Sequence, residues 1–259
     1  MKKRIVGAII VVAVLITALL LGDKIFALTI TVAALFGLKE LIDIKYEKEK
    51  INLVKFLAGI FLVLFLLNNI MYQINEKSLI ILPILGLIIP MIFYNDKNKY
   101  NINDALYLLG IIYFLAFSFG TIIEMREISI FKCIYIFIIS FVTDTYAYIG
   151  GMLIGKHKLT EISPKKTIEG TVVGTIMGVF IGTMFYYTLI GDLNLLITII
   201  MSLSLTILSE IGDLVFSSIK RYFGKKDYSN LIPGHGGILD RFDSVIFVSL
   251  GLALILNLL

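Results

Sequence analysis

The feature that most constrains this chain is a series of long apolar runs that contain almost no charged residues. A helix needs roughly 20 apolar residues to cross the hydrocarbon of a bilayer, and several runs of this kind occur within the 259 residues. Hydrophobic residues make up 58% of the chain and charged residues only 16%, whereas soluble domains carry roughly a quarter charged residues. The composition therefore excludes an ordinary soluble domain and predicts a polytopic membrane protein.

The apolar runs predict an all-α fold with about nine transmembrane helices. The connection Gly22-Asp23-Lys24 is short, so the first two helices are expected to form a tight hairpin. The first run has a basic start but is long and lacks a small-residue cleavage site, which favours an uncleaved span. The predicted spans lie near residues 5–22, 25–42, 52–71, 78–94, 104–123, 129–151, 168–190, 194–216 and 242–259.

Lysine and arginine fall mainly on one side of these predicted spans. With a cytoplasmic N-terminus, the cytoplasmic loops carry 18 of these residues and the loops on the opposite side carry 4. Cytoplasmic loops of membrane proteins have such an excess, so we expect the N-terminus in the cytoplasm and the C-terminus outside. The net charge of +4 then reflects the basic residues of the cytoplasmic loops and does not indicate nucleic-acid binding. No nucleic-acid partner is expected.

Polar content divides the chain near residue 127. Residues 1–127 carry few polar groups within their spans and are predicted to be N-terminal transmembrane helices. From residue 128 onward acidic residues enter the spans and the loops become densely charged. Residues 128–259 are therefore the expected catalytic region, with cytoplasmic loops at residues 156–167 and 218–241.

Four acidic residues of the predicted spans after residue 128 are candidates for a functional site, and by the assigned topology all approach the cytoplasmic face. Ionised groups there are costly and tend to mark a functional site. Each alone is compatible with pairing to a nearby lysine at the interface, but four together favour a polar site. The four are Asp144, Glu169, Glu210 and Asp213, and the last two are spaced so that both carboxylates lie on one side of a helix.

The two dense loops supply groups that suit phosphate. The glycines after Pro233 allow the backbone to present N–H groups to phosphate oxygens, although a simple turn is the alternative. Asp240 and Asp243 begin the last span, where they either cap the helix or ligate a metal. Carboxylate ligands suit Mg²⁺, and lysine and arginine neutralise phosphoryl charge. The chain lacks a P-loop, and with His157 and His235 as its only histidines a histidine-rich metal site is excluded.

A long run in the second loop reads Ser217-x-Ile219-Lys220-Arg221-x4-Lys226-Asp227-x-Ser229-x2-Ile232-Pro233-Gly234-His235-Gly236-Gly237-Ile238-x-Asp240-Arg241-x-Asp243. Upstream lie Asp144, Gly155-x-His157-Lys158 and Ser163-Pro164-x-Lys166-Thr167-x-Glu169-Gly170. Together these segments resemble the integral-membrane phosphatidate cytidylyltransferases, also called CDP-diacylglycerol synthases. The resemblance covers about residues 140–245.

The resemblance implies a reaction in which phosphatidic acid and CTP give CDP-diacylglycerol and pyrophosphate. The lipid phosphate would attack the α-phosphorus of CTP in line, assisted by metal. It also implies Mg²⁺ with K⁺ beside it and an active site at the cytoplasmic interface. The Ile-, Lys- and Asn-rich composition is typical of an AT-rich bacterial genome, so the cell inner (cytoplasmic) membrane is the expected location.

The same resemblance suggests residue roles. The expected metal ligands are Asp213, Asp240, Asp243 and Asp144. The expected catalytic residues, mainly phosphate clamps, are Lys220, Arg221, Lys226, Asp227, His235 and Arg241. The expected substrate-binding residues are Ser163, Lys166, Thr167, Glu169, Ser217, Gly236 and Gly237.

Other interpretations stay open at this point. A related CTP-using enzyme, such as a lipid kinase or a cytidylyltransferase for another lipid phosphate, has similar needs because lipid choice depends on groove shape. A transporter would place polar groups at the midplane of broken, repeated helices, whereas these cluster at one face. An inactive scaffold is disfavoured by the intact carboxylates. Membrane lipids are expected partners, and a homodimer is left open.

Overall fold

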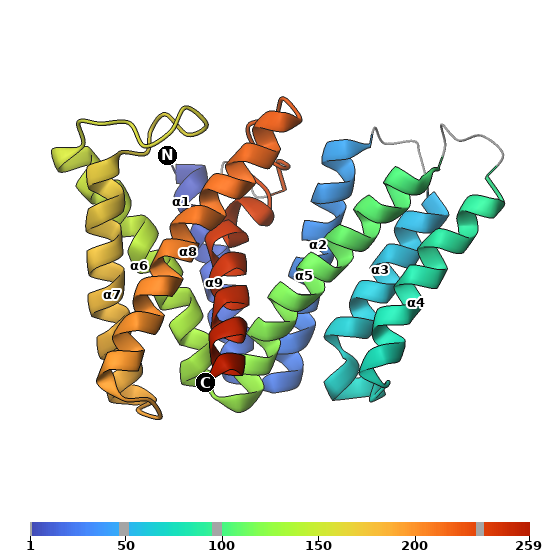
Figure 1. The fold of residues 1–259 in the computed structure, drawn as a ribbon, viewed down its shortest axis with the longest axis horizontal. Coiled ribbons are helices and arrows are strands. Elements are labelled where there is room, and N and C mark those ends of the chain that lie inside the picture. Colours follow the sequence, from blue (N-terminus) through green and yellow to red (C-terminus); the bar gives the residue numbers. More distant parts are fainter. Residues whose placement is uncertain (1, 47–51, 95–99, 232–235) are drawn as a thin grey trace. The chain divides into compact units, whose positions relative to one another are not determined.

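The computed structural model describes residues 2–46, 52–94, 100–231 and 236–259 (Figure 1). In these ranges the chain forms nine α-helices and no β-strand, with a π-helical turn at Asn68–Tyr72 and a 3₁₀ turn at Ile89–Ile92. The helices are α1 (Lys2–Leu21), α2 (Asp23–Lys45), α3 (Asn52–Leu66), α4 (Glu76–Ile88), α5 (Ile102–Ile128), α6 (Ile130–Ile154), α7 (Ile168–Leu189), α8 (Leu195–Tyr222) and α9 (Leu239–Leu258).

The predicted all-α fold is confirmed over the described ranges, and each predicted span overlaps one helix. Five described helices, α2, α5, α6, α7 and α8, are long and apolar enough to cross a membrane. The length and composition of these helices therefore indicate a multi-pass membrane protein. Shorter apolar stretches occur at Val11–Leu21 of α1 and Leu53–Leu66 of α3. Gly22 alone separates α1 from α2, and its φ of 110° is open to glycine without steric cost.

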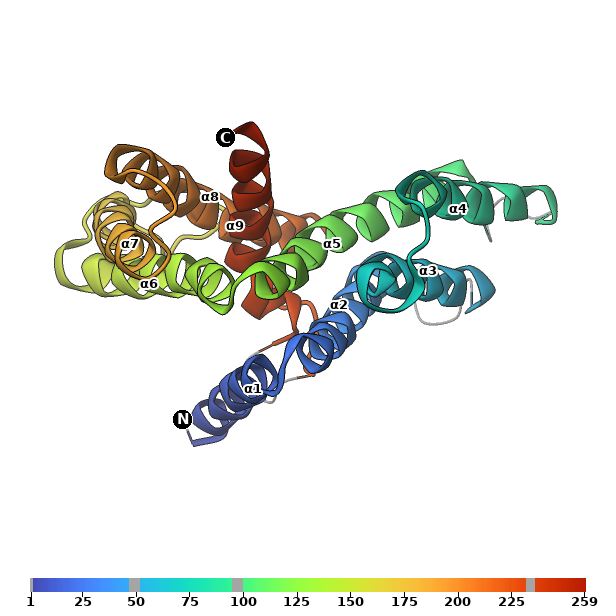
Figure 2. The same ribbon diagram turned by 90° about the horizontal axis from the view of Figure 1, so that it is seen from below.

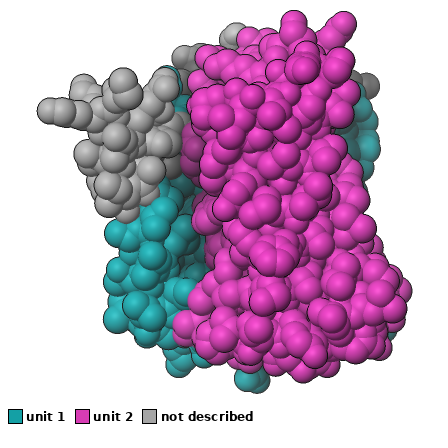
Figure 3. Space-filling view, turned by 90° about the vertical axis from the view of Figure 1, so that its left-hand side faces the viewer, with its two compact units in different colours: residues 1–123, 228–238 teal, residues 124–227, 239–259 magenta. Residues whose placement is uncertain are grey.

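The chain divides into two compact units, coloured separately in Figure 3. The first unit comprises residues 1–123 and 228–238, and the second comprises residues 124–227 and 239–259. The segment 228–238 thus belongs with the N-terminal helices, although it lies between α8 and α9 in the sequence. The predicted confinement of the chemistry to residues 128–259 stays a prediction.

In the first unit, consecutive helices from α1 to α4 pack against one another, and α3 and α4 lie side by side in both views (Figures 1 and 2). Tyrosine hydroxyls connect α5 to α2. The Tyr107 hydroxyl donates to the Leu41 carbonyl at 2.6 Å, and the Tyr46 hydroxyl donates to the Asp104 carboxylate at 2.8 Å. These bonds satisfy polar groups that are otherwise costly within an apolar helix bundle.

In the second unit, α6 and α7 approach each other closely because one face of α7 carries only glycines. Gly170, Gly174, Gly178 and Gly182 recur every fourth residue and are all buried. A β-carbon on Gly174 would lie 2.7 Å from the Thr143 carbonyl oxygen, which belongs to the backbone of α6. Small residues at this spacing are typical of tightly packed membrane helices. The close approach fixes the part of α6 that carries the next residue, Asp144.

A larger side chain at Gly174 is expected to force α6 and α7 apart, since the obstacle is backbone and cannot rotate away. We predict that Gly174→Leu destabilises the protein by about 3 kcal/mol, measured as a lower thermal unfolding midpoint in detergent. Gly110→Leu is the matched control, because a β-carbon at Gly110 meets nothing within 4 Å. Equal midpoints for the two variants would contradict this account of the helix contact.

Candidate active site

Carboxylates from two helices, α6 and α8, gather around one lysine in the second unit. The Lys166 ammonium lies 2.8 Å from Asp213 Oδ2 and 3.7 Å from Glu210 Oε2. The Glu210 side chain is only 6% exposed, whereas Asp213 is 28% exposed and Lys166 is 19% exposed. Glu210 is therefore shielded from solvent beside the lysine, whereas Asp213 and Lys166 remain accessible to a ligand.

The loop before α7 folds back on itself and so fixes Lys166. The Leu159 amide donates to the Lys166 carbonyl at 2.9 Å, and the Lys166 amide donates to the Ser163 carbonyl at 3.0 Å. Lys158 and Thr167 form an isolated β-bridge. Because the backbone on either side of Lys166 is hydrogen-bonded, its side chain projects from an ordered position.

The start of α7 anchors the same loop. Thr167 caps the helix, and its hydroxyl accepts a hydrogen bond from the Gly170 amide at 3.1 Å. The Glu169 carboxylate accepts hydrogen bonds from the Lys156 amide at 3.0 Å and the His157 amide at 3.2 Å, and it also pairs with His157 Nδ1 at 2.6 Å. Thr167 and Glu169 therefore hold the loop, and their predicted contacts with substrate stay predictions.

Two opposing effects act on the pKa of Lys166. Burial lowers it, but the nearby carboxylates of Asp213, Glu210 and Asp144 raise it by more, so the pKa lies above its ordinary value. The side chain therefore carries a positive charge at every physiological pH. It can attract and orient an anion but cannot act as a general base.

Asp144 of α6 and Asp243 of α9 complete the acidic cluster. Both interact electrostatically with Asp213. The Ser244 hydroxyl donates to Asp144 Oδ2 at 3.0 Å, and the Ser244 amide donates to Asp243 Oδ1 at 3.0 Å. Ser244 thus ties the two carboxylates together. Sequence reasoning missed this residue, although it directly follows Asp243.

A second lysine, Lys220, is buried and joins the end of α8 to the start of α9. The Lys220 ammonium donates to Asp240 Oδ1 at 2.7 Å, and the two side chains are only 11% and 6% exposed. Lys220 also acts electrostatically on Asp243. The ion pair therefore connects the two helices that present Asp213 and Asp243.

The side-chain atoms of this cluster that could bind a metal are all carboxylate or hydroxyl oxygens, which are the kind of ligand that Mg²⁺ prefers. The Thr171 hydroxyl donates to Glu210 Oε2 at 3.2 Å, while Glu210 Oε1 is buried without a hydrogen-bond partner. Across the part of the chain that the structure describes, no three His, Cys, Asp or Glu side chains converge as a ready metal site. The oxygen atoms of these side chains fit Mg²⁺ in their chemistry.

The other predicted site residues lie in several places. Ser217 joins the cluster, since its hydroxyl donates to Asp213 Oδ1 at 3.3 Å. The Arg221 guanidinium is exposed and donates to the Lys225 carbonyl at 3.1 Å. His235 lies outside the described residues. Lys226, Asp227 and Arg241 are exposed. Gly236 and Gly237 belong to the first unit, and the predicted roles of these residues stay predictions.

In the first unit, Glu40 of α2 holds the glycine segment in place. Its side chain is buried, and Oε1 accepts hydrogen bonds from the Ser229 hydroxyl at 2.6 Å and the Ile238 amide at 2.9 Å. A β-carbon at Gly237 would collide with the Glu40 carboxylate, so a larger residue there would displace this side chain from its hydrogen bonds. Gly236 has a φ of 81°, which also favours glycine. Sequence reasoning missed Glu40, although an acid inside the predicted span 25–42 was a usable signal.

The fold and the site first define a class: a multi-pass membrane protein with an acidic cluster that is paired with Lys166 and Lys220. Residues 2–259 match the Cytidylyltransferase family, and the chain belongs to this family. It is 35% identical over 259 residues to the phosphatidate cytidylyltransferase of Staphylococcus haemolyticus, covering 96% of each chain. It is 34% identical over 253 residues, again 96% of each chain, to the phosphatidate cytidylyltransferase of Staphylococcus aureus strain COL. The predicted family is confirmed.

The Lys220–Asp240 pair is expected to contribute to both stability and turnover. Lys220→Met leaves the buried Asp240 carboxylate without its ammonium, which we predict lowers the free energy of unfolding by about 3 kcal/mol. The double variant Lys220→Met/Asp240→Asn should regain most of this stability but not the activity. Unfolding midpoints and turnover of both variants test the prediction, and a double variant as unstable as the single one would contradict it.

The Glu40 contacts predict a local effect. Glu40→Ala should raise the hydrogen-exchange rate of the Ile238 amide at least about tenfold, because a hydrogen bond to a charged acceptor is lost. Glu40→Gln should have a smaller effect, since it keeps an acceptor oxygen. Glu76→Ala, at an exposed glutamate of the same unit, is the control. Unchanged exchange at Ile238 in Glu40→Ala would overturn the assignment.

Proposed function

We propose that this chain transfers the CMP moiety of CTP to phosphatidic acid and releases CDP-diacylglycerol and pyrophosphate. The relatives that carry this enzyme name match the chain over nearly its full length. The structural observation that supports the proposal is the Lys166 ammonium, anchored by its folded loop beside Asp213 and Glu210. A fixed cation next to an acidic cluster suits the binding of phosphates.

The proposed orientation places this cluster at the cytoplasmic interface of a bacterial cell membrane. It rests on nine spans with a cytoplasmic N-terminus and on the excess of basic residues in the loops of one side. CTP is soluble, whereas the acyl chains of phosphatidic acid stay in the bilayer. A reaction between them therefore requires a site where water and membrane meet.

The proposed reaction is a single in-line displacement at phosphorus. A phosphate oxygen of the lipid forms a bond to the α-phosphorus of CTP, while the bond from the α-phosphorus to the bridging oxygen breaks and pyrophosphate leaves with the electron pair. The nucleophile is already an anion, so no strong base is needed. The main obstacle is repulsion between two polyanions, which the Lys166 and Lys220 ammonium groups would reduce.

Asp144, Asp213 and Asp243 are the proposed ligands of Mg²⁺, and Asp240 is a further candidate beside Lys220. When bound, the ion would neutralise charge that develops on the phosphate oxygens. K⁺ is proposed as a second cation at the same carboxylates. Residues of the chain would position the charged groups of the site. Lys166 lies beside the acidic cluster, and Ser244 forms hydrogen bonds with both Asp144 and Asp243.

Labelled CTP tests the proposed function directly. Purified protein in detergent is incubated with phosphatidic acid, Mg²⁺ and CTP labelled at either the α- or the γ-phosphate. Cytidylyl transfer moves the α-label into lipid and releases the γ-label in pyrophosphate. A lipid kinase would instead move the γ-label into lipid. Absence of α-labelled lipid across several detergents and salts would refute the proposal.

Lys166 should matter for this reaction through its charge. We predict that Lys166→Gln lowers kcat about 100-fold or more, while Lys166→Arg is milder. Because the pKa of Lys166 is raised, the side chain keeps its proton at every pH below its ordinary pKa, and the loss should be equal at pH 6.5 and 8.5. The exposed Lys77 provides the matched control, Lys77→Gln. A loss confined to one end of this pH range would contradict the assignment.

A further inference from the structure

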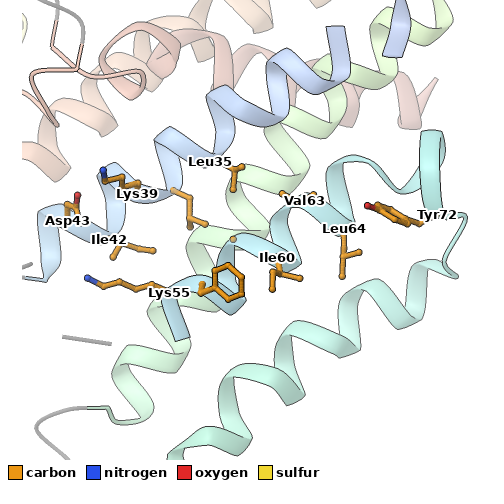
Figure 4. A pocket seen from close by; sticks show the side chains of 12 residues that line it. Leu35, Lys39, Ile42, Asp43, Lys55, Ile60, Val63, Leu64 and Tyr72 are labelled. Carbon is orange, nitrogen blue, oxygen red and sulfur yellow. The ribbon is translucent and has the colours of Figure 1, made fainter. Parts of the chain in front are cut away.

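An apolar groove lies between α2 and α3 of the first unit (Figure 4). Its volume is about 620 Å³. Phe56 on its rim is largely exposed, so the groove is accessible from outside the protein. The apolar side chains that line it include Leu35, Leu38 and Ile42 of α2 and Ile60, Val63 and Leu64 of α3.

One end of this groove is charged and the other is not. Lys39 and Lys55 lie at the same end, with Asp43 between them, while Tyr72 lies at the opposite end (Figure 4). The Lys55 ammonium also lies 5.9 Å from the centre of the Tyr46 ring. Two lysines and one aspartate give the charged end a net positive charge, which is complementary to an anion.

The apolar wall beyond the lysines has the length of one membrane leaflet. From Lys55 to Leu64 the helix rises about 14 Å, roughly half of the 30 Å or so of hydrocarbon in a bilayer. A phosphate held by the lysines would therefore lie at the membrane surface, with an acyl chain extending along Ile60 and Val63. This geometry matches a phospholipid better than a soluble anion, which would leave the apolar wall uncovered.

We propose that this groove binds one anionic diacyl phospholipid of the bilayer, with its phosphate at Lys39 and Lys55 and one acyl chain between α2 and α3. Basic pockets between membrane helices bind anionic headgroups in this way. The lipid is a bound ligand and not the reacting substrate, since the groove consists of residues of the first unit and contains neither Lys166 nor the carboxylates around it. The proposal requires that α2 lies in the membrane, and it does not depend on the proposed reaction.

Two kinds of variant separate the charged end from the apolar groove. Lys39→Gln/Lys55→Gln removes the positive charge and leaves the groove open. Gly59→Leu fills the groove and leaves the lysines in place, because a β-carbon at Gly59 meets only Leu35 at an ordinary 3.7 Å. The matched controls are Lys77→Gln, at an exposed lysine of the same unit, and Gly110→Leu, which points into open space.

Native mass spectrometry of the full chain in detergent then counts bound lipid during titration with phosphatidylglycerol or phosphatidylcholine. Phosphatidylglycerol is a phosphodiester, so it cannot replace phosphatidic acid as the nucleophile. The wild type should retain one phosphatidylglycerol and bind phosphatidylcholine more weakly. Each lysine near a headgroup contributes severalfold to affinity, so the double lysine variant should weaken phosphatidylglycerol binding roughly tenfold or more. Gly59→Leu should weaken both lipids, and the controls neither.

Several outcomes would overturn the proposal. Equal retention of the two lipids by the wild type would show that the lysines do not select an anionic lipid. Unchanged phosphatidylglycerol binding in Gly59→Leu would show that the lipid does not bind in the groove. A dimeric mass that Gly59→Leu converts to a monomer, without a change in bound lipid, would show that a second copy of the chain covers this face. Cytidylyl transfer measured on the same samples keeps failure of this proposal distinct from failure of the proposed function.

Discussion

The rest of the second unit depends on the balance of buried charge. Carboxylates within membrane helices are costly unless they are paired or face a polar cavity, yet Asp144 projects from α6 and both Glu210 and Asp213 project from α8, which are candidate membrane spans. Asp243 projects from the start of α9. Lys166 lies against two of them, and Lys220 reaches Asp240 and influences Asp243. Each lysine is itself held by the protein, one by a folded loop and one by the end of a helix. The cluster is tolerated because cations are built in beside it.

This balance depends in turn on how closely the helices approach. The loop that holds Lys166 ends at the capped start of α7, and the glycine face of α7 lies in backbone contact with α6 next to Asp144. A wider gap between these helices would separate the lysine from the Asp144 carboxylate of α6. The electrostatics of the site and the small side chains of α7 are therefore parts of one arrangement. Thr171, one turn along α7, reinforces it by donating to Glu210.

Much of this was predictable from the sequence, and the limits have physical causes. Apolar runs indicate helices because a segment that crosses lipid must satisfy its own backbone hydrogen bonds. Acidic residues within the spans indicate a candidate site because a charge in the membrane is costly. The pairing of lysines with these acids could not be predicted from the sequence. Lys166 lies more than 40 residues before Glu210 in the chain, and only the packing of α7 on α8 brings the two together. The glycine pattern of α7 was visible but predicts close packing only once the partner helix is known. Glu40 lies near the end of the predicted span 25–42, where an acid also suits the start of a loop. Asp240, Arg241 and Asp243 stand at the start of α9, which is not among the five described helices that length and composition identify as candidate spans.

The geometry of Lys166 also explains how a residue can balance buried acids and still serve a phosphate. An ammonium group has three N–H donors. Asp213 at 2.8 Å takes one of them, while Glu210 at 3.7 Å is beyond normal hydrogen-bond distance and interacts mainly through charge. Donor capacity thus remains on a side chain that is still 19% exposed. An approaching phosphate would meet a cation that is already oriented, and Asp213 would not need to release it. In the proposed reaction this preorganisation avoids part of the entropic cost of bringing two anionic substrates together.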